Sequence, residues 1–227
     1  MDIPFFTTPR FDERRDNAVP QYIIVHGTET EDGEEAHYYY MGGAKQISPH
    51  YMVMVDGSIR QYVHEDKRAW HAGIGHWRGI DDMNSHSIGI EVVNGGEPAD
   101  CPPYNDAQIE TLIKLGNDIC ARWNIPPQNI LGHKDIAPIR KRDPGRHFPW
   151  QRCAEGGFGF WPQEGAEVED IKEALVKIGY NPNRPEDVLM RAFQDHYVPE
   201  IWLGTVTFRQ GIELTRKRIG YFLDNLL

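Results

Sequence analysis

The sequence predicts an α/β fold, a mixed central β-sheet flanked by helices, followed by a small C-terminal domain of three helices. Short β-branched runs alternate with helical patterns through the first 150 residues, which is typical of helices packed on a sheet. Beyond a glycine-rich segment, apolar residues recur only at helical spacing. At 227 residues, the chain is long enough for one substantial core and a small second unit.

The first elements are an extended arm and a buried strand. Residues 1–20 contain Pro4, Pro9, Pro20 and a charged run, a mixture that favours an extended arm over a regular element. Residues 22–25 form a β-branched run suited to a buried strand. We therefore expect the folded domain to begin at about residue 21.

A hairpin, a further strand and a long helix follow. Residues 51–55 and 59–63 flank Asp56-Gly57, a hairpin signal that makes the sheet mixed. Residues 87–93 form another β-branched run. Apolar residues in 105–123 recur at helical spacing, and Asn105 with Gln108 resembles a capping box.

The last third of the chain predicts a linker and three helices. Residues 153–165 are rich in glycine, which favours a linker. Helical patterns then cover residues 168–178, ending at Gly179, and the stretches 185–197 and 207–226. The expected organisation is an arm over 1–20, an α/β domain over 21–162 and a helical domain over 166–227.

Charge and composition exclude several classes of protein. The chain has 24 basic and 34 acidic residues, a net charge of -10 that repels nucleic acids and anionic membranes. Its apolar runs are too short to span a membrane. The three cysteines (Cys101, Cys120, Cys153) lie far apart and support neither a disulfide framework nor a cysteine zinc site.

Three features indicate a functional site. His26 follows the strand at residues 22–25, and strand ends are where α/β sheets carry reactive groups. Glu91 lies inside an apolar run, where an unpaired carboxylate is costly to bury. The segment from Gly132 to Gly145 gathers cations and carboxylates around turn-forming residues. On spacing alone, however, a histidine is more often a packing or surface residue, since no compact ligand pair is present.

Five blocks together resemble one known family. They are Ile24-Val25-His26, Ser48-Pro49-His50-Tyr51, Arg68-Ala69-Trp70-His71-Ala72-Gly73, Ser87-Ile88-Gly89-Ile90-Glu91 and the segment from His133 to Gly145. The last is the most specific, because His133 is followed at eight residues by Lys141 and at ten by Asp143-Pro144-Gly145. Over residues 14–162 the chain resembles the type 2 N-acetylmuramoyl-L-alanine amidases, and within them the AmpD and AmiD branch.

The resemblance implies one zinc ion per chain, bound by His26, His133 and Asp143. Two imidazoles and a carboxylate leave the fourth position of a tetrahedral zinc open for water, as in catalytic sites. It also implies that Glu91 transfers protons between this water and the leaving amine, while Lys141 stabilises the developing oxyanion. The implied reaction is hydrolysis of the amide bond between N-acetylmuramic acid, or its 1,6-anhydro form, and L-alanine of peptidoglycan or muropeptides, in cell-wall recycling or remodelling.

The other residues of these blocks have two readings. The resemblance places His50, Trp70 and His71 around the substrate groove, yet each side chain fits core packing equally well. Asp135 is expected to act as a helix cap or to support a ligand. The remaining histidines are expected at the surface or in packing: His37, His64, His76, His86, His147 and His196. Gly27 stands where relatives often carry histidine or tyrosine, which changes the pocket wall.

The helical segment resembles the three-helix peptidoglycan-binding domain attached to such amidases, notably in Ile171-Lys172-Glu173-Ala174-Leu175 and Arg191-Ala192-Phe193-Gln194. The usual aspartate-glycine turn before its last helix is replaced by Leu203-Gly204-Thr205. Two roles follow for residues 166–227: a second contact with peptidoglycan, or a helical cap on the first domain.

Other functions stay open on the sequence. Peptidoglycan-recognition modules share the fold implied here but lose a metal ligand when they bind without cutting, whereas this chain keeps the full ligand set. A protease or deacetylase with a similar zinc site would not explain the block pattern. The N-terminus lacks the basic start and apolar stretch of a signal peptide, so a cytoplasmic location is expected, or a periplasmic one if a leader has been trimmed.

Overall fold

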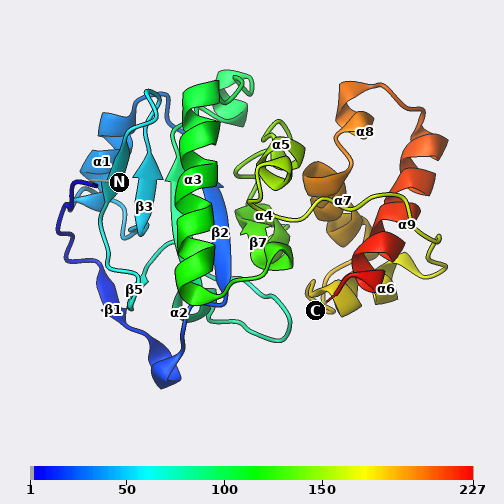
Figure 1. Cartoon of the computed structure of the whole chain (residues 1–227), viewed down its shortest axis with the longest axis horizontal. Helices are drawn as coiled ribbons and strands as arrows, with labels where there is room; N and C mark the ends of the chain where they lie inside the picture. The colour runs from blue at the N-terminus through cyan, green and yellow to red at the C-terminus, as the bar shows by residue number, and fades with distance from the viewer. Residues whose placement is uncertain (1–2, 227) are drawn as a thin grey trace.

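Five strands form the central sheet of the structure, a computed structural model that describes residues 3–226 (Figure 1). In spatial order they are β4 (Ile59–Gln61), β3 (Tyr51–Val53), β6 (Ser87–Val92), β2 (Tyr22–Gly27) and β7 (Ile130–Gly132). Strands β3, β6, β2 and β7 are parallel, and β4 is antiparallel to β3. The predicted mixed sheet and its hairpin are therefore confirmed.

One face of the sheet is covered by α3 (Asp106–Trp123), which lies in front of β2 in Figure 1. Because side chains alternate along a strand, Ile23 points to this face and is buried in one apolar cluster with Ile109. The predicted capping box is present. The side chain of Asn105 accepts from the backbone N–H of Gln108 at 2.9 Å, and the side chain of Gln108 accepts from the N–H of Asn105 at 3.2 Å.

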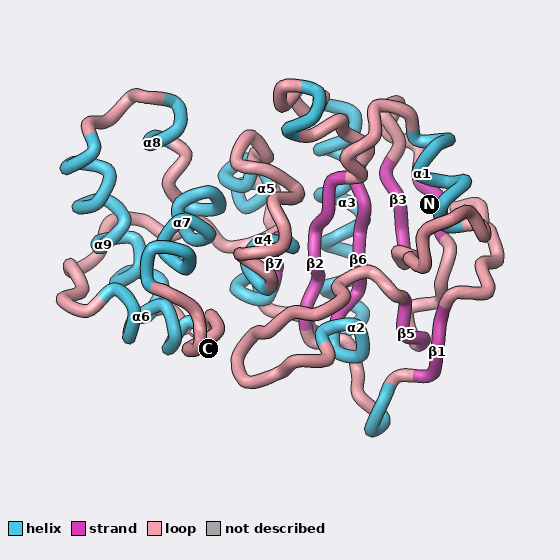
Figure 2. The backbone as a smooth tube through the Cα atoms, turned by 180° about the vertical axis from the view of Figure 1, so that it is seen from behind, coloured by secondary structure: helices cyan, strands magenta, loops and turns pink. Residues whose placement is uncertain are grey.

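The opposite face shares its core with the C-terminal helices. Tyr22, Ile24 and Leu131 of the sheet belong to one buried cluster with Leu175 and Phe193. The helices are α6 (Ile171–Ile178), α7 (Glu186–Tyr197), the single turn α8 (Glu200–Leu203) and α9 (Phe208–Asp224). Figure 1 shows them beside the β7 edge, and Figure 2 shows α2 (Met83–His86) against the lower part of β6. The three predicted helices are confirmed, and α8 was not predicted.

The N-terminal arm differs from the expected extended lead-in. It contains β1 (Phe11–Glu13), paired antiparallel with β5 (Lys67–Ala69), and a one-turn 3-10 helix, η1 (Arg15–Asn17). Arg14 is 9% exposed and donates hydrogen bonds to the carbonyl oxygens of Glu65 and Ser85, at 2.8 and 2.7 Å. These buried contacts fix the arm to the α/β part.

The expected linker begins later than predicted, because α5 (Trp150–Glu155) includes Cys153. Cys153 is fully buried, so its apolar contacts continue the helix before the glycines begin. The remaining elements are α1 (Gly33–Tyr40), α4 (His133–Ile136), η2 (Glu97–Ala99) and η3 (Pro127–Asn129). Within residues 3–226, no helix combines the length and apolar character needed to cross a bilayer.

Candidate metal centre and active site

The register of the parallel strands brings His26 and Glu91 together. They are directly paired residues of β2 and β6. In β6, Ile88, Ile90 and Val92 are buried on the α3 side, so Glu91 points to the other face with His26. The apolar residues on either side of Glu91 in the sequence thus form the face of β6 that is buried under α3. The residues that alternate with them, including Glu91, project to the opposite face, where the candidate site lies.

His133 and Asp143 complete a cluster at the same sheet edge. His133 directly follows β7, whose Gly132 pairs with Val25 of β2. Nδ1 of His26, Nδ1 of His133 and Oδ2 of Asp143 lie 2.9 to 3.1 Å apart. Within residues 3–226 these three are the only histidine, cysteine and carboxylate ligands grouped closely enough to hold a metal ion.

Hydrogen bonds on the far side of each imidazole orient Nδ1 towards the cluster. Nε2 of His133 lies 2.9 Å from the carbonyl oxygen of Ala72, which can only accept, so Nε2 carries the proton and Nδ1 a lone pair. Nε2 of His26 lies 3.0 Å from Nδ1 of His71, whose Nε2 lies 3.3 Å from Oγ of Ser87. A proton on Nε2 of His26, donated to His71, likewise frees its Nδ1.

The donor set fits a divalent metal ion. The lone pair on Nδ1 of His133 faces Oδ2 of Asp143 at a distance of 2.9 Å. Both atoms are hydrogen-bond acceptors, so this arrangement requires a cation or an added proton between them. Oδ1 of Asp143 is buried without a hydrogen-bond partner among the described residues. The pKa of His26 is lowered to about 4, mainly by burial and then by the proximity of His133. Its imidazole is therefore neutral at pH 7 and able to bind a metal ion.

Glu91 and Lys141 line the cavity into which this cluster opens. The cavity has a volume of about 260 Å³ and extends to Glu29, Tyr39 and Lys45. The pKa of Glu91 is raised to about 8, mainly by burial and then by the negative charge of Asp143, while the positive charge of Lys141 opposes this rise. Oε2 of Glu91 is buried without a partner in the described chain, and Nζ of Lys141 lies 4.0 Å from Oδ1 of Asp143. A carboxyl group with a raised pKa and a lysine side chain therefore share the cavity with the candidate ligand cluster.

His71 packs against His26 and forms a hydrogen bond with its ring. It is 8% exposed, and its ring lies over Gly89 of β6, where an added Cβ would come within 2.3 Å of the ring. Glycine in the run Ser87-Ile88-Gly89-Ile90-Glu91 is thus needed for space. Both expectations for His71 fit this placement, because the ring packs against a candidate ligand and also lines the cavity into which the ligand cluster opens.

His50 and Trp70 have different surroundings. His50 is fully buried, its Nδ1 accepts from the N–H of Gly89 at 3.0 Å, and its Nε2 donates to the carbonyl of Lys67 at 3.1 Å. This placement removes His50 from the substrate groove and gives it a structural position. Trp70 lines a second cavity of about 320 Å³, and its Nε1 donates to Asp12 at 2.7 Å.

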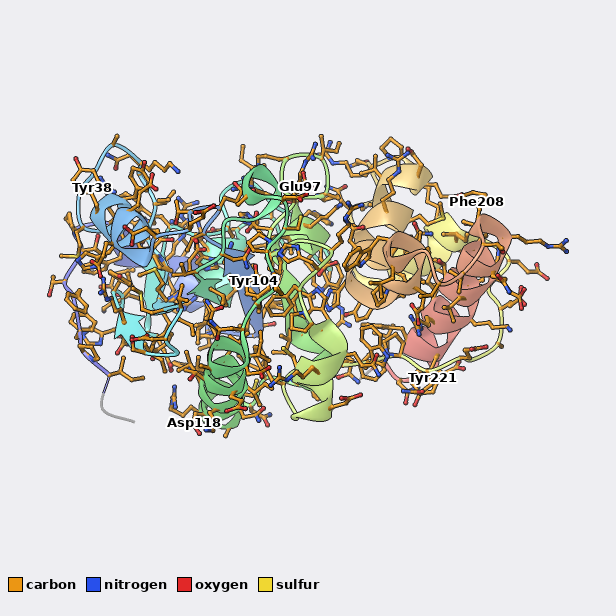
Figure 3. All side chains as sticks on the ribbon, turned by 90° about the horizontal axis from the view of Figure 1, so that it is seen from above. Tyr38, Glu97, Tyr104, Asp118, Phe208 and Tyr221 are labelled. Carbon is orange, nitrogen blue, oxygen red and sulfur yellow. The ribbon has the colours of Figure 1, made fainter. Side chains whose placement is uncertain are left out.

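The structure gives a role to two residues to which the sequence assigned none. Tyr104, labelled in Figure 3, donates from its hydroxyl to the carbonyl of Pro144 at 2.8 Å and so braces the loop that carries Asp143. A Cβ on Gly27 would come within 2.7 Å of this hydroxyl, so the tyrosine occupies the space that Gly27 leaves. Arg140 donates to the carbonyls of Ala72 and Ile74, at 2.8 and 2.7 Å. Arg140 lies in the charged segment from Gly132 to Gly145, but no local pattern indicates the partners of either residue, because both act across long sequence separations.

Comparison with known proteins agrees with this geometry. Residues 15–146 match the family model of the N-acetylmuramoyl-L-alanine amidases. The N-acetylmuramoyl-L-alanine amidase AmiD of Escherichia coli is 38% identical over 70% of this chain and 69% of its own length. The 1,6-anhydro-N-acetylmuramyl-L-alanine amidase AmpD of Citrobacter freundii is 37% identical over 64% of this chain and 84% of its own.

The similarity extends to the C-terminal helices. The structure of E. coli AmiD in complex with the substrate anhydro-N-acetylmuramic acid-L-Ala-D-γ-Glu-L-Lys superimposes with a TM-score of 0.75 and 32% identity. The superposition covers 92% of this chain and 93% of that one. The α/β part and the helices that follow it therefore occur together in that amidase.

Proposed function

Because the chain belongs to the N-acetylmuramoyl-L-alanine amidase family and is an enzyme of this class, we propose that it uses one zinc ion to hydrolyse the bond between muramic acid and L-alanine. The substrate is peptidoglycan or a muropeptide, with N-acetylmuramic acid or its 1,6-anhydro form as the sugar. The convergence of His26, His133 and Asp143 within 2.9 to 3.1 Å of one another is the observation that carries this proposal.

His26, His133 and Asp143 would hold the metal through two imidazole nitrogens and one carboxylate oxygen. When bound there, zinc supplies Lewis-acid chemistry: it lowers the pKa of water to about 7 and polarises a carbonyl. His71 and the carbonyl of Ala72 keep the two imidazoles in the ligating orientation.

Glu91 moves the protons of the reaction. As a base it accepts one proton from the attacking water while the oxygen bonds to the lactyl carbonyl carbon of muramic acid. It then gives this proton to the nitrogen of L-alanine as the carbon–nitrogen bond breaks, which yields a carboxylic acid and an amine. A pKa of about 8 suits the second step, in which Glu91 donates a proton. The first step needs the charged carboxylate, which a divalent cation held by His26, His133 and Asp143 would favour. The positive charge of Lys141 stabilises the oxyanion that forms on the attacked carbonyl.

The peptide stem extends from the site into a neighbouring groove. Trp70, Gly73 and Arg140 line the second cavity, and the last two also line a third one of about 590 Å³. This third cavity continues to Arg184 and to the exposed side chains of Ile74 and Ile139. Its arginines suit the carboxylates of a muropeptide stem, such as the one bound by AmiD.

A cleavage assay with both sugar forms tests the proposed function. Protein stripped of metal and reloaded with one zinc per chain is incubated with a muropeptide that carries N-acetylmuramic or 1,6-anhydro-N-acetylmuramic acid, and products are identified by mass. Release of the intact peptide with a free alanine amino group, only after zinc loading, is expected. Binding of both muropeptides without cleavage would instead support a recognition module.

A further inference from the structure

The C-terminal helices contact a carboxylate two residues beyond the candidate ligand His133. Asp135 is 3% exposed and accepts three hydrogen bonds. The backbone N–H of Gly132 donates to Oδ2 at 2.7 Å, which confirms the expected helix cap. Tyr180, which follows α6, donates to Oδ1 at 2.8 Å, and Nδ1 of His196 in α7 donates to Oδ2 at 2.7 Å. Two of the three donors thus come from the C-terminal helical part, one from α7 and one from the turn after α6.

Both donors are themselves fixed by packing. Tyr180 is 1% exposed, and its ring lies edge-on to Trp77 with centroids 4.8 Å apart. His196 is 5% exposed and stacks on Trp150 with centroids 3.8 Å apart. Buried, packed donors hold the carboxylate in one orientation, since rotation would leave it unpaired in an apolar core.

The orientation of Asp135 determines the turn that carries His133. Gly132 ends β7 and His133 is the first residue of α4, so the hydrogen bond from Gly132 to Asp135 closes the turn around the candidate ligand. His133 Nδ1 must also remain within about 3 Å of His26 and Asp143 for all three to bind one ion. A looser turn would spread these atoms.

We propose that Tyr180 and His196 are positioning residues for the metal centre: through Asp135 they hold His133 in place, so the C-terminal helices are an integral part of the zinc site. This inference rests on the zinc centre proposed above. It also gives the helices a role that does not require them to bind peptidoglycan.

The test measures zinc affinity in full-length variants by competition with a chromophoric chelator. Tyr180→Phe removes only the hydroxyl that reaches Asp135, and His196→Phe keeps a ring that can stack on Trp150. Each is expected to weaken zinc binding on the order of tenfold, the lower end of the effect of losing outer hydrogen bonds to a metal centre. In an Asp135→Ala background, Tyr180→Phe should have no further effect, because its partner is gone.

Two controls separate positioning from general stability. Tyr197→Phe removes the hydroxyl of a neighbouring buried tyrosine that makes no hydrogen bond to Asp135 in the described chain, and should leave zinc affinity unchanged. Ile219→Ala opens a cavity in the same core, so it should lower the melting temperature without weakening zinc binding.

The proposal is overturned if zinc affinity in Tyr180→Phe, His196→Phe, Tyr197→Phe and Ile219→Ala simply follows the melting temperature of the metal-free protein. It is also overturned if Tyr180→Phe binds zinc like the wild type. Absence of zinc binding in the wild type would instead refute the proposed zinc centre. The two failures are therefore distinguishable.

Discussion

Glu91 lies directly beside His26 because the two residues are register partners in adjacent parallel strands. Paired residues of neighbouring strands are separated by about 5 Å and project to the same face. The proposed acid–base group and one candidate ligand therefore keep a fixed separation that is set by backbone hydrogen bonds. Such a scaffold is more rigid than a loop, which suits a reaction that depends on exact proton transfer.

Glu91→Gln should retain zinc and lose most turnover. The amide has the same shape as the carboxylate but cannot accept a proton, so kcat should fall by about a hundredfold to ten thousandfold. Turnover and bound zinc are measured on the same sample. Glu29→Gln is the matched control, because Glu29 is an exposed carboxylate on the same cavity wall. Near-normal turnover in zinc-loaded Glu91→Gln would assign the proton transfer to another group.

Asp143→Ala should lose zinc and activity together. Without its carboxylate, two imidazoles form an incomplete site with weak affinity. Metal content after dialysis is measured by elemental analysis, with Asp118→Ala, an exposed carboxylate of α3, as the control. Full zinc occupancy in Asp143→Ala would show that the ion binds elsewhere.

Phe193→Ala should destabilise the whole chain and not only its C-terminal helices. Phe193 is fully buried in the core that the helices share with Ile24 and Leu131 of the sheet. The expected loss in free energy of unfolding is about 3 to 5 kcal/mol. Urea unfolding followed by tryptophan fluorescence and by circular dichroism should give one coincident transition.

Phe208→Ala is the control for this experiment. Phe208 is 83% exposed at the outer side of the helical part (Figure 3), so its truncation should change stability by less than about 0.5 kcal/mol. Two separate transitions in Phe193→Ala, with only one shifted, would show that residues 166–227 unfold as an independent domain.

Arg184→Gln should raise KM for muropeptides with a long acidic stem and leave kcat nearly unchanged. Arg184 lines the third cavity, away from the ligand cluster, so it contributes to binding and not to proton transfer. A substrate that ends after L-alanine should be unaffected. Arg191→Gln, on the exposed side of α7, serves as control. Equal KM values for both stems in Arg184→Gln would remove this groove from the substrate path.

His50 should make stability depend on pH. In the folded chain the pKa of His50 is lowered to about 3, mainly by burial and then by the positive charge of Arg14. A histidine in the unfolded chain has a pKa of about 6.5. The folded state therefore keeps the ring neutral while the unfolded state takes up a proton. This contribution is fully present above pH 6.5 and is lost as the pH falls towards 3.

His50→Gln tests this dependence in the metal-free protein. Between pH 6 and 4, the variant should lose stability less steeply than the wild type, by up to about 1.4 kcal/mol per pH unit. The free energy of unfolding is measured in urea at each pH. His64→Gln, at an exposed histidine, should keep the wild-type slope. An unchanged slope in His50→Gln would mean that the folded protein accommodates a charged ring there.

The sequence by itself determined four of the five strands of the central sheet, all but β7, together with the principal helices and the order of the candidate site residues. Local patterns suffice for these: Ile88, Ile90 and Val92 alternate with Gly89 and Glu91, and Asn105 with Gln108 marks the start of α3. The family resemblance added the ligand set, because its blocks are specific in order and spacing. These features depend on neighbours a few residues apart.

Only the tertiary structure decided which face each histidine occupies and what covers the sheet. His50 and His71 lie in similar sequence blocks, yet one pairs with backbone groups and the other with His26. Asp135 gains its partners Tyr180 and His196 from 45 and 61 residues away. Such contacts depend on how apolar faces pack across the whole chain. The local spacing of apolar residues, with a period of two in strands and 3.6 in helices, does not predict them.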